Sequence, residues 1–452
     1  MNATEIRSTA TLALVYGSRM LGLFMLLPVF ILLGQDLQGA TPFLLGLALG
    51  AYGLSQALLQ IPFGLLSDRF GRKKLIYAGL LIFVAGSLVA AASESVYGVI
   101  AGRVLQGAGA IASVLMALVS DLTREEHRTK AMAGIGLSIG LSFALSLVLG
   151  PLVGNWLGLS GLFALTALLA LASMALVAWV VPDPVSSTVH RDAQPVKEQL
   201  GHVLRQPALL RLDFGILVLH LALTAAFLVV PLLLQERLSV PAASHWWVYL
   251  SVMGCAFFAM LPFIILGEKK RQLKTVMTGA VALLGLSTTA LLWSAQTLLS
   301  LWWVLFFFFM AFNMLEAMLP SLISKEAPAA SKGSAMGVYS TSQFLGAFIG
   351  GTAGGWVAGS WGIEGVIVLI VGAVSLWLAV VAGMTPPRHA TSFTLRLQPL
   401  EGGAVEEIRN RLAAVAGVEE VVILPKEGEA YLKVDKRTLD EKALRQLPGV
   451  TD

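Results

Sequence analysis

Long apolar segments separated by short polar loops make up most of the sequence. A bilayer core of about 30 Å is crossed by about 20 apolar residues in helical form, and a helix satisfies its own backbone groups in lipid. Only 13% of the residues are charged and 56% are hydrophobic, whereas soluble proteins are about 25% charged, so lipid must cover much of this apolar surface. The segments that are long enough lie at 10–34, 43–66, 75–93, 96–120, 129–156, 158–181, 208–235, 244–267, 273–293, 297–324, 333–360 and 362–384. We therefore predict an all-α membrane protein with twelve transmembrane helices.

Lysine and arginine are concentrated in every second loop between the predicted spans. The loops that carry them contain Arg69, Arg72, Lys73 and Lys74; Arg124, Arg128 and Lys130; Lys269, Lys270, Arg271 and Lys274; and Lys325 and Lys332. Because such loops stay on the cytoplasmic side of a membrane, we expect both termini in the cytoplasm, which requires an even number of spans. The formal net charge is +4, and its cations do not form a stripe, so we expect no nucleic-acid partner.

The sequence divides near its middle, where the polar stretch 185–207 separates the sixth span from the seventh and is expected to be a cytoplasmic linker. Residues 117–121 resemble residues 321–325, and the similarity continues beyond the following loop at the same offset. Related halves are typical of secondary transporters. We therefore expect two six-helix halves, at 1–184 and 208–386.

Residues 391–452 have the composition of a soluble domain. Apolar residues alternate at 393–397 and at 430–434, which predicts strands, and residues 405–415 keep helical spacing. With a further strand near 421–424, the order is βαββα, that of a small ferredoxin-like domain, which a last strand would complete. A regulatory or ligand-sensing role and a stabilising role are both compatible with this domain.

The loop between the second and third spans has a distinctive residue order. It starts at Gly64 and reads Gly-Leu-Leu-Ser-Asp-Arg-Phe-Gly-Arg-Lys-Lys. Asp68 ends the second span among cations that include Arg69 and Arg72. Gly64 and Gly71 lack a Cβ and so allow close helix approach and a tight turn. Taken alone, these residues are also compatible with a loop that only retains this end in the cytoplasm.

This order resembles the loop 2–3 motif of the major facilitator superfamily. Residues 103–110, 21–29 and 150–154 resemble motifs of the same superfamily in spans 4, 1 and 5, and the last of these is associated with proton antiporters. The resemblance covers residues 10–384, and the soluble tail makes the chain most similar to the YajR group of drug-efflux transporters. It implies a fold of two six-helix halves that work by alternating access.

The resemblance also implies a gate at the cytoplasmic end. Asp68 would meet the start of span 11, near 333–336, where the positive end of the helix dipole favours a carboxylate. Arg72 would pair with Asp121 at the end of span 4. These contacts would hold the halves together when the cytoplasmic side is closed.

Four ionisable residues inside apolar spans are candidates for proton coupling. They are Arg19, Arg103, His220 and Glu316. An ionised group at mid-membrane costs about 2.5–3.5 kcal/mol on insertion scales, so it normally faces a cavity or a partner. Glu316 is the best candidate for a carboxylate that binds and releases a proton, because burial disfavours the charged form; a structural hydrogen bond is the alternative.

The other three candidates have alternatives of their own. By the family pattern, Arg103 affects the proton affinity of a nearby site, although an arginine close to the membrane surface would show the same sequence. Arg19 would be the counter-charge of Glu316 or would line the cavity. His220 titrates near neutral pH if its surroundings do not perturb it, or it is simply packed.

Four amide side chains are candidates for lining the substrate cavity. They are Gln56, Gln60, Gln106 and Asn313. Gln56 and Gln60 lie one turn apart in span 2, so both could face the cavity, and hydrogen bonding between helices is the alternative.

These features together predict a secondary transporter of the bacterial inner membrane that exports a small, partly apolar solute against proton uptake. No nucleophile, metal cluster or phosphate-binding loop is evident in the sequence, so we expect neither an enzyme nor a cofactor. The expected partners are the solute, protons and the lipid bilayer, and we expect a monomer. A facilitator or proton symporter of the same fold, and a non-transporting sensor that signals through 391–452, are the alternatives.

Overall fold

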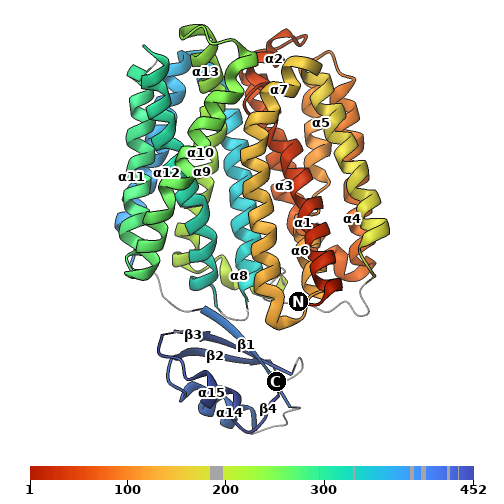
Figure 1. Ribbon diagram of the computed structural model, residues 1–452, viewed down its shortest axis with the longest axis vertical. Coiled ribbons are helices and arrows are strands. Elements are labelled where there is room, and N and C mark those ends of the chain that lie inside the picture. Colours follow the sequence, from red (N-terminus) through yellow and green to blue (C-terminus); the bar gives the residue numbers. More distant parts are fainter. Residues whose placement is uncertain are drawn as a thin grey trace.

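The predicted apolar segments form long helices in the computed structural model (Figure 1). The structure describes residues 1–183, 197–294, 296–328, 331–386, 391–398, 404–424, 428–435 and 437–451. Its membrane region consists of α1 (Ala3–Phe24), α2 (Phe30–Leu33), η1 (Gly34–Asp36), α3 (Pro42–Phe70), α4 (Arg72–Ala91), α5 (Val96–Ala108), α6 (Ala112–Asp121), α7 (Glu125–Val180), α8 (Lys197–Val203), α9 (Pro207–Leu232), η2 (Leu233–Arg237), η3 (Ala242–Ser244), α10 (His245–Lys269), α11 (Leu273–Ser294), α12 (Leu298–Glu326) and α13 (Lys332–Ala382). Of the predicted linker, residues 185–196 lie outside the described residues.

The helices account for the twelve predicted spans. Within the described residues, nine helical segments are long and apolar enough to cross a membrane. Two of them, α7 and α13, turn back at glycines with positive φ, Gly158 at 64° and Gly362 at 66°, so each supplies two spans. The more polar α1 supplies the remaining one. Gly158 and Gly362 are separated by the same interval as the repeated segments 117–121 and 321–325, so the turn is part of the repeat.

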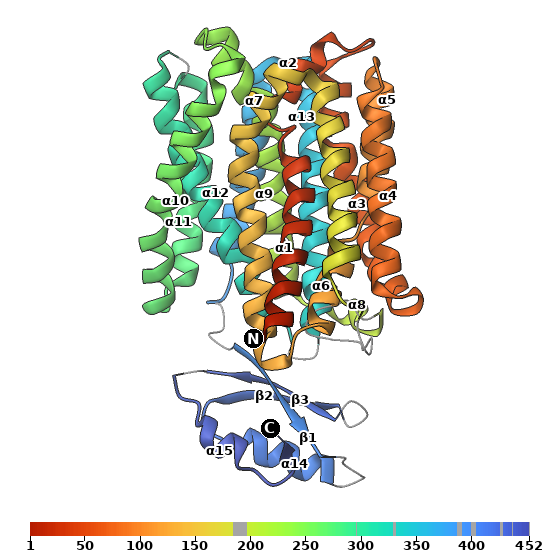
Figure 2. The ribbon, with the colours of Figure 1, turned by 45° about the vertical axis from the view of Figure 1, so that its right-hand side comes forward.

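Two six-helix halves stand side by side, as the sequence predicts. Figures 1 and 2 show α10 and α11 at one side of the bundle and α4 and α5 at the other. The small domain lies below the bundle, and the N-terminus lies at the same end. This end is called the domain end below, and the other is called the far end.

The halves pack most closely where α3 meets α13. A Cβ added to Gly46 of α3 would lie 2.1 Å from the carbonyl oxygen of Gly351 in α13, and one added to Gly50 would lie 2.7 Å from that of Phe348. One added to Gly355 would lie 2.5 Å from the carbonyl oxygen of Pro42, the first residue of α3. Such backbone-to-backbone contact requires small residues, as at many helix interfaces in membranes. This glycine seam closes the bundle toward its far end in this conformation.

The tail forms the predicted ferredoxin-like domain. Its elements are β1 (Thr391–Leu397), α14 (Ala404–Ala413), β2 (Val418–Leu424), β3 (Glu429–Val434), α15 (Glu441–Arg445) and β4 (Val450–Thr451). The strands form an antiparallel sheet in the order β2-β3-β1-β4, with Phe393 opposite Leu432. The alternating residues Leu395 and Leu397 are buried, as predicted. β4 is the last strand that completes the fold.

The small domain contacts the bundle through β3 and the residues that follow it. Lys433 is 2% exposed, and its ammonium group donates to the carbonyl oxygen of Ser324, near the end of α12, at 2.6 Å. Asp435 accepts two hydrogen bonds from Arg271, at 2.8 and 2.7 Å, and Arg437 donates to the carbonyl oxygen of Lys269 at 2.8 Å. All three bundle partners belong to the second half.

Candidate functional site

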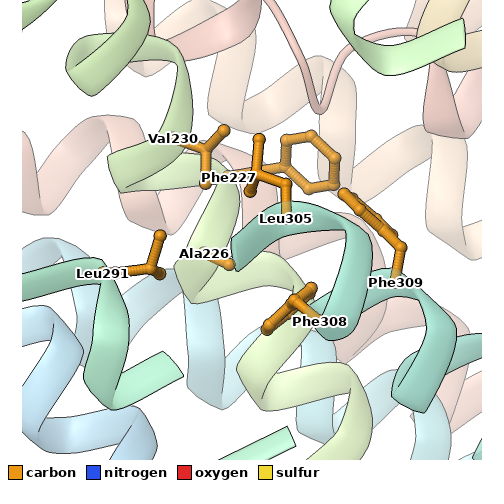
Figure 3. Close-up of a pocket in the computed structure, with 7 residues that line it drawn as sticks. All are labelled: Ala226, Phe227, Val230, Leu291, Leu305, Phe308 and Phe309. Atoms are coloured by element: carbon orange, nitrogen blue, oxygen red, sulfur yellow. The ribbon is translucent and has the colours of Figure 1, made fainter. Parts of the chain in front are cut away.

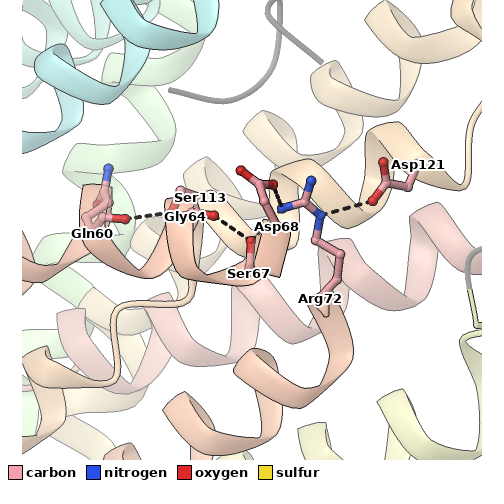
Figure 4. A network of polar contacts seen from close by, with 7 residues as sticks. All are labelled: Gln60, Gly64, Ser67, Asp68, Arg72, Ser113 and Asp121. Carbon is pink, nitrogen blue, oxygen red and sulfur yellow. Dashed lines mark hydrogen bonds and ion pairs between the residues drawn. The ribbon is translucent and has the colours of Figure 1, made fainter. Parts of the chain in front are cut away.

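The loop between α3 and α4 holds a buried network centred on Arg72 (Figure 4). Arg72 is 2% exposed, and its Nε donates to Asp121 Oδ2 at 3.0 Å. Its Nη1 donates to Ser67 Oγ at 2.5 Å and forms an ion pair with Asp68. Ser67 in turn donates to the carbonyl oxygen of Gly64 at 2.6 Å. The network therefore ties the end of α3, the start of α4 and the end of α6 together at the domain end.

The remaining residues of this loop occupy different surroundings. Gly71 has φ +95°, a conformation that L side chains rarely adopt, so the turn between α3 and α4 requires glycine there. Arg69 is exposed, and its guanidinium lies 5.5 Å from the centroid of the Phe70 ring, outside the Arg72 network. The side chain of Asp68 is 28% exposed, and its predicted contact with the start of span 11 stays a prediction.

Glu316 lies in a polar cluster at the junction of α9, α12 and α13. Gln343 of α13 donates to Glu316 Oε1 at 3.3 Å, and its amide nitrogen lies 2.8 Å from His220 Nε2. His220 Nε2 is 3.9 Å from Glu316 Oε2, close enough for an ion pair when the histidine is protonated. We call Glu316, His220 and Gln343 the coupling cluster.

Two residues of this region were not among the candidate site residues. Gln343 is a polar residue inside a long apolar span, and that is the signal that sequence reasoning missed. Asp213 of α9 is 5% exposed, and neither of its carboxylate oxygens has a hydrogen-bond partner among the described residues. The second half therefore contains one buried carboxylate, Asp213, and one half-buried carboxylate, Glu316.

Arg103 lies in the first half and uses every nitrogen of its guanidinium. Nε donates to the carbonyl oxygen of Ala48 at 3.2 Å, and Nη2 donates to that of Leu49 at 3.3 Å. Nη1 donates to Gln106 Oε1 at 2.9 Å, and the Gln106 amide donates to Ser87 at 2.8 Å. These bonds join α5 to α3 and α4 inside one half. Any effect of Arg103 on proton affinity stays a prediction.

Arg19 is not the counter-charge of Glu316 in this conformation. Its Nη2 donates to Gln56 Oε1 at 2.6 Å, and the Gln56 amide donates to Gln60 Oε1 at 3.1 Å. Glu316 instead contacts residues of its own half. The reason is topological, because Arg19 on α1 is packed inside the first half, between the rings of Tyr52 and Phe83.

The amides of the predicted cavity set separate into two groups. Gln56, Gln60 and Gln106 are buried and hydrogen-bonded within the first half. Asn313 is half-buried on α12, and its Nδ2 is buried without a hydrogen-bond partner among the described residues. The structure thus favours interhelical bonding for Gln56 and Gln106 in this conformation, bonds Gln60 to Gln56 within α3, and leaves the Asn313 amide available.

A small pocket within the second half has no polar lining (Figure 3). Its volume is about 10 Å³, room for about one water molecule. It is lined by Ala226, Phe227, Val230, Leu291, Leu305, Phe308 and Phe309. We interpret it as a packing defect between α9, α11 and α12, because neither its size nor its lining suits a solute.

Comparisons with known proteins agree with this architecture. The profile of the Major Facilitator Superfamily matches residues 12–351. The chain is 47% identical over 453 residues to the inner membrane transport protein YajR of Escherichia coli (strain K12), a similarity that covers 99% of each chain. It is 27% identical over 375 residues to the multidrug resistance protein MdtH of Yersinia pestis (strain Pestoides F), covering 79% of this chain and 90% of that protein.

A solved structure has the same fold at lower sequence similarity. The crystal structure of the human organic anion transporter MFSD10 (TETRAN) superposes with a TM-score of 0.58 at 18% identity, covering 84% of this chain and 100% of that one. At this identity the likeness concerns the fold alone. With twelve spans in two halves and a superfamily profile that matches most of its length, the chain belongs to the Major Facilitator Superfamily of membrane transporters.

Proposed function

We propose that this transporter exports a small, partly apolar solute in exchange for protons. The coupling cluster is the observation that carries the proposal. A carboxylate and a histidine that share one glutamine, on three helices of a mostly apolar bundle, are suited to ion or proton binding. An ionisable group inside a membrane loses its hydration at a cost in free energy, so its presence there makes it a candidate for a functional role.

Proton binding would change the packing of the cluster. With Glu316 ionised, a protonated His220 is attracted across 3.9 Å, and with Glu316 neutral this attraction is lost. The cluster joins α9, α12 and α13, and α13 also forms the glycine seam with α3. A ligand shifts a conformational equilibrium by its differential affinity for the two states. Protonation can therefore bias which end of the bundle is open.

The Arg72 network supports a gate at the domain end. We propose that this end faces the cytoplasm, because the loops rich in lysine and arginine lie there. The network fixes the ends of α3 and α6 as one unit, and Asp68 would engage the start of α13 when the halves close there. Residues 1–184 and 208–386 would then move as the two rocking units.

The direction of transport is supported by a relative rather than by geometry. The protein MdtH, 27% identical to this chain, is named as a multidrug resistance protein, a name that fits export. Gln60 and Asn313 are the amides that we propose would line the solute path once the halves separate.

Transport in proteoliposomes tests the proposal. A solute found by thermal-shift screening would be followed in two modes, namely accumulation driven by a pH gradient and solute exchange without a gradient. Glu316→Gln mimics a permanently protonated side chain, so we expect it to abolish gradient-driven accumulation and to retain exchange. His245→Gln is the matched control, because His245 is a buried histidine outside the cluster that contacts the carbonyl oxygen of Val240.

Other outcomes would favour the alternatives. Net solute flux that is independent of the gradient and unaltered by Glu316→Gln would show a facilitator. Accumulation in the same direction as proton flow would show a symporter. Absence of flux with every solute, together with ligand binding by the ferredoxin-like domain, would favour a sensor.

A further inference from the structure

Arg19 is a buried arginine whose hydrogen-bonding capacity is largely unused. It is 4% exposed, and one nitrogen, Nη2, donates to Gln56 at 2.6 Å. Its Nε and Nη1 are buried without a hydrogen-bond partner among the described residues. The guanidinium carbon lies 5.8 Å from the ring centroid of Tyr52 and 5.4 Å from that of Phe83. The guanidinium therefore lies between two aromatic rings, and two of its nitrogens have no hydrogen-bond partner among the described residues.

Arg103 shows that the same half can give every guanidinium nitrogen of a buried arginine a hydrogen-bond acceptor. It is 2% exposed and lies 5.0 Å from the same Tyr52 ring, yet all three of its nitrogens donate to protein oxygens. The unused donors of Arg19 are thus not a general consequence of burial beside Tyr52. An unsatisfied buried donor is costly, and each one in a native structure requires an explanation.

The surroundings of Arg19 supply donors and aromatic surface but no negative charge. Among the described residues, no carboxylate forms an ion pair with it. The Tyr52 hydroxyl is also buried, and no described residue forms a hydrogen bond with it. Two nitrogens of the charged guanidinium, which can only donate, and the Tyr52 hydroxyl beside it thus have no partner among the described residues, so the missing partner is an acceptor that carries negative charge.

We propose that Arg19 and Tyr52 recognise an anionic oxygen group of the transported solute, namely the carboxylate of an amphipathic organic acid. This inference rests on the proposed transport function and names its substrate class. The guanidinium and the Tyr52 hydroxyl bind the carboxylate, and Gln56 orients the guanidinium through its own contact. Charge-assisted hydrogen bonds are the strongest that a site of this kind can offer. The rings of Tyr52 and Phe83 provide an apolar wall for the body of the acid.

The position of Tyr52 explains how a solute would reach this site. Its ring packs edge-on against Phe344 of α13, with centroids 6.1 Å apart, so Tyr52 lies at the boundary between the halves. Gln56 connects Arg19 to Gln60 one turn farther along α3. Separation of α3 from α13 would uncover Tyr52 and give access to Arg19. The site is closed in the present conformation and opens with the movement that transport requires.

Equilibrium binding to the purified full-length protein tests the assignment. The probes are carboxylic acids paired with their amides, namely 2-naphthoate and 2-naphthamide, 4-phenylbutyrate and 4-phenylbutyramide, and decanoate and decanamide. Thermal shift and titration at pH 7.5, without any gradient, measure the preference for acid over amide. We expect the wild type to prefer at least one acid. Arg19→Gln should weaken its binding by about 10- to 100-fold, Arg19→Lys should retain part of the preference, and Tyr52→Phe should reduce it.

The stability of the ligand-free variants separates a recognition role from a structural one. Arg19→Gln should leave the melting temperature unchanged or higher, because it removes a charge with unused donors, whereas Arg103→Gln should lower it and keep the acid preference. Equal binding of every acid and its amide by the wild type would overturn the proposal. So would binding of none of the acids, or a preference that survives in Arg19→Gln. Glu316→Gln should keep the preference, so a failure of proton coupling would be seen separately.

Discussion

Arg72 joins three helix ends because its guanidinium lies between two carboxylates. Asp121 is fully buried and Asp68 is partly exposed, and both pair with the same side chain. An arginine presents several donors in a fixed plane, which a lysine at this position could not reproduce. The motif in the loop therefore depends on the shape of one residue as well as on its charge.

Removal of Arg72 should destabilise the first half strongly. Arg72→Met removes a cation that pairs with the buried side chain of Asp121, and breaking a buried pair from one side costs about 3–5 kcal/mol. The free energy of unfolding in mixed micelles measures this loss. Arg69→Met is the matched control, because an exposed arginine contributes about 0–1 kcal/mol. The double variant Arg72→Met/Asp121→Asn should recover part of the loss, and a double variant no better than Arg72→Met would contradict the pairing.

Single residues differ in how well the sequence predicts their partners. The Arg72–Asp121 pair was predicted from the resemblance to the superfamily, and the structure contains it. The partner of Glu316 was not, because Gln343 comes from a helix that is adjacent only in the folded bundle. Arg19 was predicted to face either Glu316 or the cavity, and packing inside the first half excluded the first alternative in this conformation.

The helices also have some features that the local sequence predicts and others that depend on distant contacts. Hydropathy locates the spans, yet α1 starts at Ala3 rather than at residue 10, because Asn2 and Glu5 form a capping box that extends the helix through polar residues. The helical run from Ala3 also explains how Glu5 reaches Arg124, whose side chain donates to Glu5 Oε1 at 3.0 Å. A hydropathy profile alone predicts neither a helix cap nor an ion pair between residues distant in the sequence.

The contact between the ferredoxin-like domain and the bundle makes a prediction about pH. The backbone N–H of Arg437, followed by the side chain of Arg271, holds the pKa of Asp435 below its ordinary value. A carboxyl with a lowered pKa stabilises the contact at every pH above its ordinary pKa, and that contribution is lost as the pH falls through the lowered pKa. We therefore expect the domain to stay docked between about pH 5 and 8 and to loosen below about pH 4.

Fluorescence energy transfer between dyes on α14 and on the loop that precedes α11 measures this docking. Asp435→Asn should lower the transfer efficiency already at neutral pH. Glu407→Gln, which affects only the exposed pair with Arg411 on α14, should leave it unchanged. Equal efficiency in wild type and Asp435→Asn at pH 7 would mean that the Arg271 contact does not hold the domain.

The whole molecule is two related halves with one small domain attached to the second. The number of spans, the repeat and the order of the tail's elements follow from hydropathy and periodicity, and the structure confirms them. The sequence does not determine which end is closed, because the proposed mechanism requires the same chain to adopt both arrangements. In this conformation the glycines of α3 and α13 bring the two halves together toward the far end.

Opposite distance changes at the two ends are the central claim of the alternating-access account. Cys255, the one cysteine of the chain, lies exposed on α10 and can be replaced by serine. One sample then carries spin labels at Lys74 and Lys270, which report the distance between the halves at the domain end. A second sample carries labels at Glu94 and Gln296, which report the distance at the far end. All four residues are exposed.

Double electron–electron resonance on these pairs, over a range of pH and in Glu316→Gln, is the most direct measurement. We predict two populations whose weights change with protonation of the cluster, such that the domain-end distance shortens as the far-end distance lengthens. Asp68→Asn should increase the population that is open at the domain end. Distances that stay constant across pH in wild type and in both variants, or that lengthen together at both ends, would contradict the account.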